Sequence, residues 1–399
     1  MPRKKKKKSV LRSKFVSREN FVDRSKLKPK QIKIVRRKEN TEKNNEKPKE
    51  QKQQEEKPVW QQIIDQIEAT HKGLGKLVLF EILSDIAGKC VLVVGSAGTG
   101  KSTSLKAIAP NIPREKLYID ALTLSGLKHI QKALSNANLT IMVDDLSKGA
   151  TEYSQVQTVC VVGELVYSGW FTKLTGNLAI RIMNFNGSAI LNCQPPLLKR
   201  LMASPEWETD IRDKVVRYYH LRYPIEPNKA KPNFQISYNY PRNNEIKIPI
   251  EITKTPEYKK ALENFQYEFT ITRAKEHLDD YLVASAKLHN RKKVTLDDVK
   301  LIEWLSRIFR LEPNLFTKKE LEGKRKLDTS LIPLLGLIVT FKEPTIVEYV
   351  KRFQISKSRL YEIIAEHNQY VLLKGNSGRV ISTKEAKELL QEIGEWLHD

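Results

Sequence analysis

Cysteine and long apolar segments are both scarce in this sequence, and each scarcity excludes a class of protein. The three cysteines among 399 residues are Cys90, Cys160 and Cys193, which lie far apart between apolar neighbours. This spacing is typical of reduced core residues in a cytosolic compartment and fits neither a disulfide framework nor a zinc site. No apolar run is long enough to span a bilayer, and no apolar segment follows the basic N-terminus as in a signal peptide. We therefore expect no membrane association.

Acidic residues are nearly absent from the first 38 residues, which contain 17 Lys or Arg but only Glu19 and Asp23. This stretch carries most of the formal net charge of +23. The following residues, up to 58, are rich in Glu, Lys, Gln and Asn and have almost no apolar side chains. We expect residues 1–58 to form a disordered arm and linker. Its charge favours binding to nucleic acid phosphates, with a nuclear localisation signal or a solubilising tail as alternatives.

The most specific motif is Gly95-x4-Gly100-Lys101-Ser102, a phosphate-loop pattern between a short apolar run and a helical pattern. Glycines allow backbone N–H groups to surround a phosphate, and the helix N-terminus adds partial positive charge. Lys101 is expected to reach the β- and γ-phosphates, and the Ser102 hydroxyl to bind Mg²⁺. The alternative is a chance glycine-rich turn. The pattern predicts a site for ATP and Mg²⁺ lined by Gly95, Ser96, Ala97, Gly98, Thr99, Gly100, Lys101, Ser102 and Thr103.

Two carboxylates, Asp144 and Asp145, follow the apolar run 139–143 about forty residues after the phosphate loop. At the end of a buried strand, Asp144 would hold Mg²⁺ through water and Asp145 would polarise the attacking water. Paired acids in such a place also cap a following helix. The alternation of apolar runs with helical patterns indicates an α/β fold with a parallel sheet, and the two motifs together predict a triphosphatase.

The order of these motifs resembles the AAA+ ATPases, specifically the branch that contains the minichromosome maintenance (MCM) replicative helicases. The segment Asp144-Asp-Leu-Ser-Lys148 looks like the Asp-Glu-Phe-Asp-Lys of that family, and residues 284–299 look like its lid. The resemblance covers about residues 60–222 and 260–399. It implies a P-loop AAA+ core, an α-helical lid and a C-terminal winged-helix domain. It also implies that copies of the chain assemble into a ring, with a hexamer expected.

The resemblance assigns three further residues to the site. Asn192, in the apolar stretch 188–195, matches the sensor-1 asparagine, whose amide orients the attacking water. Arg212, before the last core strand, matches the arginine finger that enters the neighbouring subunit's site, with Arg200 as a weaker choice. Arg273, early in a helical pattern, matches sensor 2, a second cation for the γ-phosphate. The plainer alternatives are a turn-forming Asn192 and a surface ion pair at Arg212.

Residues 170–181 predict two strands around the turn signal Thr175-Gly176-Asn177. A hairpin at this point in the chain is similar to the pre-sensor-1 hairpin of the same branch, which lines the pore of the ring and touches DNA. Lys173 is the candidate for that contact. An ordinary surface hairpin is the alternative.

The last segment has the order of a winged helix: three helical patterns, then two short strands around Gly375-Asn-Ser-Gly378. Its second and third helices would form a helix-turn-helix, capped by a serine just before the third. Lys357, Ser358 and Arg359 would then face a DNA major groove, while Lys374 and Arg379 would reach phosphates. Winged helices also mediate protein contacts, which remains the alternative.

Five segments follow from these patterns: an arm and linker at 1–58, an AAA+ core at 59–222, a Pro/Asn-rich linker at 223–258, a helical lid at 259–325 and a winged helix at 329–399. The linker contains six prolines and an alternating stretch, 245–252, that predicts at most an edge strand. Three features depart from the family. Asp145 is one methylene shorter than the usual Glu, the basic arm stands in place of an oligonucleotide-binding domain, and the phosphate loop has the generic form and not the variant of that helicase family.

We therefore expect an ATP-dependent DNA motor, an MCM-like helicase or translocase, that works as a ring with DNA and other replication proteins as partners. One alternative is an AAA+ origin-binding initiator or helicase loader that uses ATP as an assembly switch. Another is a nucleotide-regulated DNA-binding transcription regulator with little turnover. The expected location is the cytoplasm, at the nucleoid, or the nucleus where the host has one.

Overall fold

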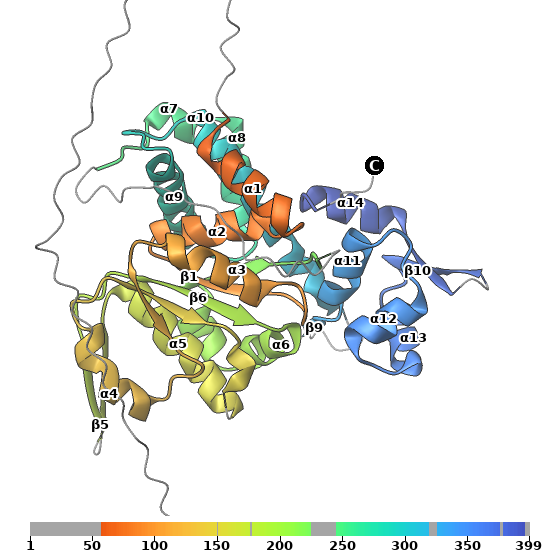
Figure 1. The fold of residues 1–399 in the computed structure, drawn as a ribbon, viewed down its shortest axis with the longest axis horizontal. Helices are drawn as coiled ribbons and strands as arrows, with labels where there is room; N and C mark the ends of the chain where they lie inside the picture. The colour runs from red at the N-terminus through yellow and green to blue at the C-terminus, as the bar shows by residue number, and fades with distance from the viewer. Residues whose placement is uncertain are drawn as a thin grey trace, which may run out of the picture. The chain divides into compact units, whose positions relative to one another are not determined.

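A parallel sheet of five short strands lies at the centre of the fold, in the order β2-β3-β6-β1-β7 (Figure 1). The computed structural model describes residues 57–149, 151–175, 178–224, 245–318, 325–375 and 378–395. Four mostly apolar strands are buried along their whole length: β1 (Cys90–Val94), β3 (Leu139–Val143), β6 (Ser188–Cys193) and β7 (Val215–Tyr219). The edge strand β2 (Glu115–Tyr118) is half exposed. The predicted α/β fold with a parallel sheet is therefore confirmed.

Helices cover both faces of this sheet (Figure 1). On one face α2 (Gly75–Ile86) and α3 (Lys101–Ile108) pack against the central strands, and on the other α5 (Glu152–Ser168) packs against β1 and β6. The remaining helical elements of this region are α1 (Val59–Thr70), η2 (Ala109–Asn111), α4 (Leu124–Leu134), η3 (Leu146–Lys148), α6 (Pro195–Ala203) and η4 (Trp207–Ile211). Because all five strands are parallel, their carboxyl ends meet at one edge, where the site lies.

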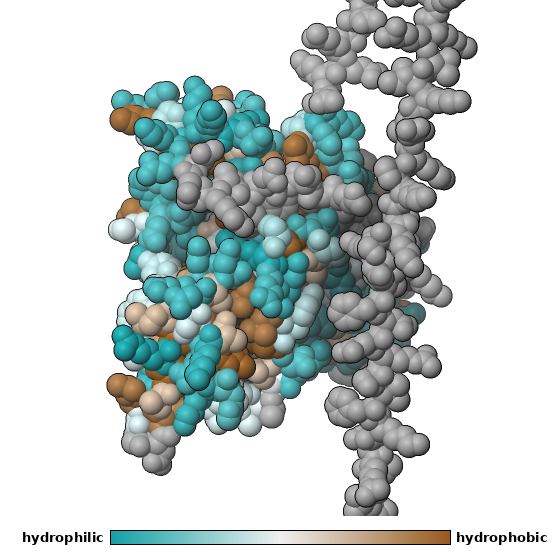
Figure 2. All heavy atoms as spheres, turned by 60° about the vertical axis from the view of Figure 1, so that its left-hand side comes forward, coloured by the Kyte–Doolittle hydropathy of each residue, from teal (hydrophilic) through white to brown (hydrophobic). Residues whose placement is uncertain are grey.

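An antiparallel hairpin, β4 (Phe171–Thr175) and β5 (Leu178–Ile182), lies between α5 and β6 in the chain, as predicted. It packs against α4 and α5, and the turn residues 176 and 177 lie outside the described residues. The face shown in Figure 2 is largely hydrophilic, with apolar side chains gathered mainly in its lower half. Leu174 in β4 and Trp170 just before it are 74% and 49% exposed. The hairpin thus presents apolar groups to its surroundings.

A helical segment follows, built from α7 (Ile250–Thr253), α8 (Pro256–Gln266), α9 (Ile271–Leu288), α10 (Leu296–Ser306) and η5 (Arg307–Leu315). Two of these helices begin inside the range predicted to be linker. Pro249 precedes α7 directly, and Pro256 is the first residue of α8 after the side-chain cap Thr255. Proline suits these positions because its fixed φ matches the first helical turn and it lacks an N–H group to satisfy. The residues predicted as an edge strand make only an isolated bridge, Lys247 to Lys293.

The C-terminal module, defined here as residues 329–395, contains α11 (Leu331–Thr340), α12 (Ile346–Phe353), α13 (Lys357–Glu366), β10 (Val371–Lys374), β11 (Arg379–Ser382) and α14 (Lys384–Glu392). A small hairpin, β8 (Phe316–Lys318) and β9 (Arg325–Leu327), precedes it. The Ser356 hydroxyl caps α13 by accepting from Arg359 N, as the sequence predicted. No helix within the described ranges has both the length and the apolar character to cross a membrane.

Candidate functional site

The phosphate loop connects the end of β1 to the start of α3, and its glycines permit a backbone that other residues would resist. Gly98 and Gly100 have φ angles of +77° and +91°. A Cβ on Gly100 would meet Leu74 Cδ2 at 2.9 Å, and one on Gly95 would meet the His220 carbonyl at 2.8 Å. Gly100 caps α3 without a side chain, and Thr103 N and Ser104 N donate to its carbonyl, so the N–H groups of Lys101 and Ser102 remain available to an anion.

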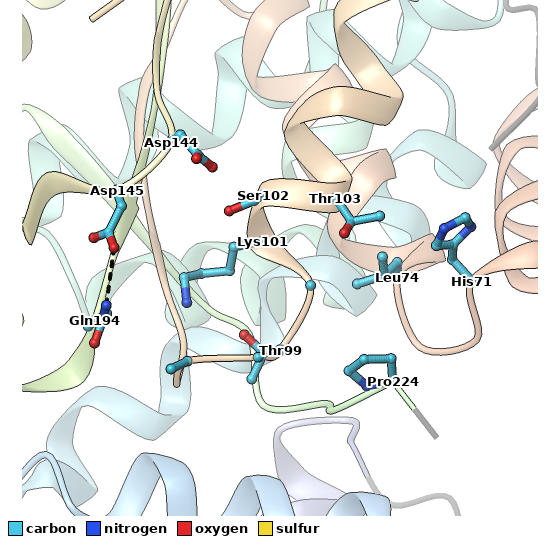
Figure 3. Close-up of a pocket in the computed structure, with 13 residues that line it drawn as sticks. His71, Leu74, Thr99, Lys101, Ser102, Thr103, Asp144, Asp145, Gln194 and Pro224 are labelled. Carbon is cyan, nitrogen blue, oxygen red and sulfur yellow. Dashed lines mark hydrogen bonds between the residues drawn. The ribbon is translucent and has the colours of Figure 1, made fainter. Parts of the chain in front are cut away.

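A cavity of about 400 Å³ opens over this loop at the carboxyl edge of the sheet (Figure 3). One end is lined by His71, Leu74 and Pro224, and the other by Asp144, Asp145 and Gln194, with the loop between them. The loop contributes Ala97, Gly98, Thr99, Gly100, Lys101, Ser102 and Thr103. The two sequence motifs predicted to act together therefore do line one cavity.

Lys101 lies at this cavity and is 8% exposed. Its ammonium donates to two carbonyls of the loop itself, Gly95 O at 2.5 Å and Ser96 O at 2.9 Å. Burial lowers the pKa of Lys101 to about 8, although Asp145 and Asp144 favour the charged form. A phosphate group that replaced the two neutral carbonyls would favour the charged form further.

Asp144 follows β3 directly and has one engaged and one open carboxylate oxygen. Its Oδ2 accepts from Lys148 Nζ at 3.4 Å, and the same ammonium reaches Asp120 at 3.3 Å. Its Oδ1 is buried and has no hydrogen-bond partner among the described residues. A buried carboxylate oxygen without a partner is costly, and Mg²⁺ prefers such oxygen ligands. Asp144 and the Ser102 hydroxyl, which line the same cavity, therefore fit a magnesium ion.

Asp145 has hydrogen bonds at both of its oxygens. Oδ1 accepts from Ser147 N at 2.9 Å and from Ser147 Oγ at 2.7 Å, so the residue caps η3. Oδ2 accepts from Gln194 Nε2 at 3.2 Å, as the dashed line in Figure 3 shows. The capping role that the sequence left open is present, and the same side chain also lines the cavity.

Sequence reasoning missed Gln194, although a signal for it existed. It directly follows β6, so it lies at the same carboxyl edge as the two aspartates. His71, Leu74 and Pro224 carried no comparable signal, because the fold brings them to the loop from connections elsewhere in the chain.

Asn192 lies in β6, paired in register with Val93 of β1, and is 1% exposed. Neither its amide oxygen nor its amide nitrogen has a hydrogen-bond partner within the described part of the chain. Leaving both groups unpaired in a buried position costs free energy that a water molecule or a ligand atom would recover. Asn192 itself does not line the cavity, although Gln194, two residues further along the chain, does.

The two predicted arginines lie apart from this cavity. Arg212 ends η4 and pairs with Glu208 at 2.8 Å, with 42% of its side chain exposed. Arg273, near the start of α9, pairs with Glu276 at 2.7 Å and stacks over Tyr167 at 4.6 Å from the ring centroid. Neither residue lines the cavity of its own chain. An arginine finger acts in the site of a neighbouring copy, so the position of Arg212 is compatible with that role. A sensor 2 residue should reach the γ-phosphate, so the position of Arg273 does not agree with the prediction.

All but one of the side chains predicted to contact DNA are exposed, but several lie beside carboxylates. Lys357 and Ser358 begin α13 at the surface. Arg359 pairs with Glu362 at 2.8 Å. Lys374 and Arg379 approach Glu343 at 3.4 and 3.6 Å. With nine Lys or Arg and eight acidic residues, the C-terminal module is close to neutral. Lys173 lies in the β4–β5 hairpin, half exposed.

No protein-family model matches the chain, and no curated protein matches its sequence. Function is therefore inferred from the cavity and the residues that line it.

Proposed function

We propose that this chain is a magnesium-dependent ATPase of the AAA+ class that acts as a ring-forming DNA motor, similar to an MCM helicase or translocase. One observation carries the proposal: the phosphate loop and the paired aspartates line a single cavity at the carboxyl edge of a parallel sheet. Ligands of open α/β sheets bind at this edge. The end of the cavity lined by His71, Leu74 and Pro224 would hold the base. The end lined by Asp144 and Asp145 would hold the terminal phosphate with its Mg²⁺.

Each residue of the site has a chemical task in hydrolysis. The N–H groups at the start of α3 and the Lys101 ammonium hold the β- and γ-phosphates. Ser102 and Asp144 would hold Mg²⁺, which neutralises phosphate charge when bound. Asp145 takes a proton from the attacking water, and Gln194 keeps its carboxylate in place through their hydrogen bond. Asn192 supplies an amide to orient that water.

Assembly supplies the remaining cation. Arg212 is exposed and distant from its own cavity, so it serves as the finger for a neighbouring copy. The β4–β5 hairpin lies in the same stretch between α5 and β6 as the pore hairpin of the MCM branch, and carries Lys173 with the exposed Leu174. In a ring these hairpins would contact DNA, while the basic arm adds affinity without sequence preference.

An ATP-dependent switch, as in an initiator, a loader or a DNA-binding regulator, is the second candidate. The observation that favours it is Asp145, whose two oxygens are both hydrogen-bonded. Both oxygens already accept hydrogen bonds from the protein, so less of the carboxylate is open to an attacking water, which favours slow turnover. The near-neutral C-terminal module also suits a protein contact as well as a DNA contact.

Strand displacement on forked DNA, measured beside ATP hydrolysis, separates these functions. We expect the wild-type chain to hydrolyse ATP and unwind the fork, and Lys101→Ala to do neither. Lys173→Ala should hydrolyse ATP but unwind poorly, whereas Lys128→Ala, an exposed lysine on the neighbouring α4, should unwind normally. Hydrolysis by assembled rings without unwinding would exclude the motor and favour an initiator or loader. Nucleotide binding with negligible turnover would favour the regulator.

A further inference from the structure

A second cleft, of about 460 Å³, lies where the start of α1 meets α10 and the turn between α9 and α10. It shares no lining residue with the nucleotide cavity. Its lining side chains with aromatic, basic or acidic groups are Trp60, His289, Arg291, Asp297, Lys300 and Trp304. The proposed hydrolysis of ATP uses none of these residues.

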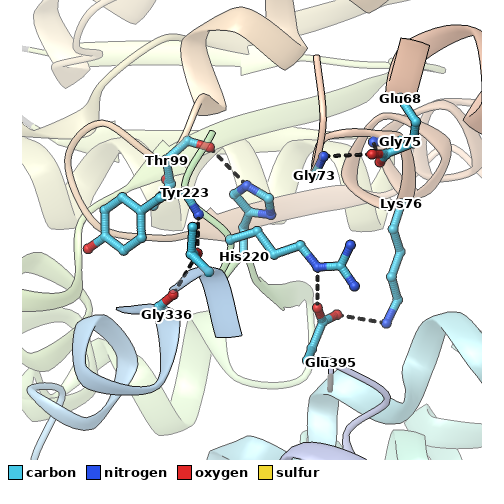
Figure 4. Close-up of polar contacts among 11 residues, drawn as sticks. Glu68, Gly73, Gly75, Lys76, Thr99, His220, Tyr223, Gly336 and Glu395 are labelled. Atoms are coloured by element: carbon cyan, nitrogen blue, oxygen red, sulfur yellow. Dashed lines mark hydrogen bonds and ion pairs between the residues drawn. The ribbon is translucent and has the colours of Figure 1, made fainter. Parts of the chain in front are cut away.

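Two indole rings form the aromatic part of this cleft. The ring centroids of Trp60 on α1 and Trp304 on α10 lie 6.0 Å apart, with the ring planes tilted by 46°. Lys76 Nζ lies over the Trp304 ring at 5.1 Å from its centroid, and Glu395 holds the same ammonium at 2.8 Å (Figure 4). These contacts restrain the orientation of the rings. Both tryptophans are only half-buried, so they offer a preformed surface on which a planar group can stack.

His289 adds a buried hydrogen-bond acceptor to the same cleft. Its side chain is 7% exposed, and its Nδ1 lies 2.8 Å from the Ser285 carbonyl. Burial lowers the pKa of His289, so the ring is neutral at neutral pH. Nδ1 carries the proton, because a carbonyl oxygen only accepts, and Nε2 is therefore an acceptor. Nε2 has no hydrogen-bond partner in the described part of the chain, and a ligand with an N–H group would satisfy it.

The charge around the cleft favours an anionic ligand. Residues 287–300 contain five Lys or Arg and two Asp. Arg291 pairs with Asp298 at 2.9 Å, whereas Lys292, Lys293 and Lys300 are exposed. A ligand that matches the cleft therefore carries both planar groups and negative charges. Nucleotides in a strand have both.

We propose that this cleft binds single-stranded nucleic acid. An unpaired base stacks on the indole pair, while phosphates of the strand meet Lys292, Lys293 and Lys300. Stacking of this kind needs a base whose face is not already covered by its neighbours in a duplex. Every base carries an N–H group on its edge, so His289 Nε2 can accept from a base without selecting a sequence.

The basic arm is attached to the chain at this cleft. Pro58 lines the cleft, and residues 1–58 precede it with 17 Lys or Arg among the first 38. A strand that the arm binds through its phosphates is thereby tethered beside a site for its bases. The inference goes beyond the proposed motor, because this binding needs neither ATP nor a ring.

The test measures binding of a labelled oligothymidylate to the full chain, at fixed salt and without nucleotide. An abasic oligonucleotide of equal length keeps the phosphates but has no bases. We expect the wild-type chain to prefer the oligothymidylate by about tenfold or more. Trp60→Ala should lose most of this preference, and Trp60→Phe should keep most of it, since phenylalanine still offers a ring.

Charge is tested separately from stacking. Lys300→Glu should weaken both oligonucleotides by a similar factor, because both carry the same phosphates. The matched control is Lys260→Glu, an exposed lysine of α8 that does not line the cleft, which should change either affinity by less than about twofold. Duplex DNA serves as a third ligand, and Trp60→Ala should bind it as the wild-type chain does.

Four results would overturn the proposal. They are equal wild-type affinity for the two oligonucleotides, a wild-type preference retained in Trp60→Ala, an equal loss of single-strand and duplex binding in that variant, and wild-type binding by Lys300→Glu. Failure of the proposed ATPase looks different. A chain that prefers the oligothymidylate but does not hydrolyse ATP would contradict the motor and leave the strand-binding cleft in place.

Discussion

The side-chain amide of Gln194 donates a hydrogen bond of 3.2 Å to Oδ2 of Asp145, across the gap between the ends of β6 and β3. The other oxygen of Asp145 is already held by Ser147. The carboxylate expected to act on water is therefore oriented from two sides, one local and one across the sheet. The Asp145 side chain is shorter than that of a glutamate and can adjust its position less. A fixed orientation towards the attacking water is therefore important for its proposed role.

Substitution of Gln194 tests that orientation. Gln194→Ala leaves Oδ2 of Asp145 without a donor, so we expect kcat for ATP hydrolysis to fall by about tenfold. The ATP affinity should change by less than about twofold, because the loop and Lys101 bind the phosphates. Gln391→Ala, an exposed glutamine on α14, is the control. A higher kcat in Gln194→Ala would mean instead that the hydrogen bond restrains turnover.

The motifs that sequence reasoning located are those whose residues are neighbours in the chain. The phosphate loop and the strand-end Asp144 depend on local spacing, and the structure has the loop between β1 and α3 and Asp144 directly after β3. The boundary between the predicted linker and the predicted lid was less accurate: the linker was expected to reach residue 258, whereas α8 begins at Pro256. Local spacing thus predicts an element better than its ends.

The contacts that sequence reasoning missed join segments far apart in the chain. His71 and Pro224 line the same cavity although they lie near opposite ends of the core segment in the sequence. Arg352 and Gly98 line one cleft although more than 250 residues separate them. No periodicity or spacing encodes such a pair, because packing alone decides which helix covers the loop. The Arg273 assignment had the same weakness: its surroundings depend on how α9 packs, and there it meets Tyr167.

ATP affinity should fall as the pH rises through about 8 in the wild-type chain. Lys101 binds phosphate in its charged form, and burial lowers its pKa to about 8, so the free site loses this cation above that pH. Bound phosphate raises the pKa again, which makes the loss gradual. Isothermal titration between pH 7 and 9.5 would measure it. In Lys101→Met the affinity should be low throughout and the slope shallower; equal slopes would show that another group titrates.

The buried carboxyl of Glu81 should make the free energy of unfolding depend on pH. Its side chain is buried on α2, with Ser104 Oγ of α3 donating to it at 2.9 Å, and burial raises its pKa from 4.5 to about 8. Because the pKa of Glu81 is higher in the folded state, the carboxyl contributes fully to the free energy of unfolding below pH 4.5. This contribution is lost as the pH rises towards 8. Glu81→Gln removes this loss and should raise the free energy of unfolding at pH 8 by about 2 to 4 kcal/mol.

Denaturant unfolding of both chains at pH 5 and pH 8 would check the Glu81 prediction. The gain from Glu81→Gln should be larger at pH 8 than at pH 5. The control is Glu115→Gln, an exposed glutamate on β2, which should change neither value by more than about 0.5 kcal/mol. A gain that is the same at both pH values would point to packing and contradict the titration of Glu81.

If Arg212 acts in the site of a neighbouring copy, two inactive variants should complement each other. Arg212→Ala should bind ATP normally but hydrolyse it at least a hundredfold more slowly, as should Asp145→Asn. In a ring, an Arg212→Ala subunit keeps its own Asp145 and can receive Arg212 from an Asp145→Asn neighbour. An equal mixture should therefore recover up to about a quarter of wild-type turnover, the share of interfaces with this arrangement. Lys199→Ala, an exposed lysine on α6, is the control.

Mixtures without recovered activity would remove Arg212 from the neighbouring site. Arg200 is then the residue to compare, since it is exposed on α6 and its ion pair with Glu152, at 2.8 Å, is also exposed. If Arg200→Ala loses turnover and complements Asp145→Asn, the finger is Arg200. If an Arg212→Ala chain hydrolyses ATP at the wild-type rate when alone, neither assembly nor Arg212 is needed for the chemistry.

The ion pairs of Glu395 should help to hold the C-terminal module against the core. Burial raises the pKa of this carboxyl, but Lys76 and Arg222 outweigh that effect and leave the pKa below its ordinary value. Glu395→Gln leaves two cations facing each other in a buried place, so we expect a loss of about 3 kcal/mol in the free energy of unfolding at pH 7. Since the pKa is lowered, the wild-type advantage is present above the unfolded-state pKa and disappears as the pH falls below it.

The same substitution separates attachment from folding. Limited proteolysis of Glu395→Gln should cut between the core and the C-terminal module faster than in the wild-type chain, because the junction opens before the sheet unfolds. Glu388→Gln, whose partner Lys384 is exposed on the same helix, should be cut at the wild-type rate. A Glu395→Gln chain that is cut at the wild-type rate would show that the ion cluster does not hold the module against the core.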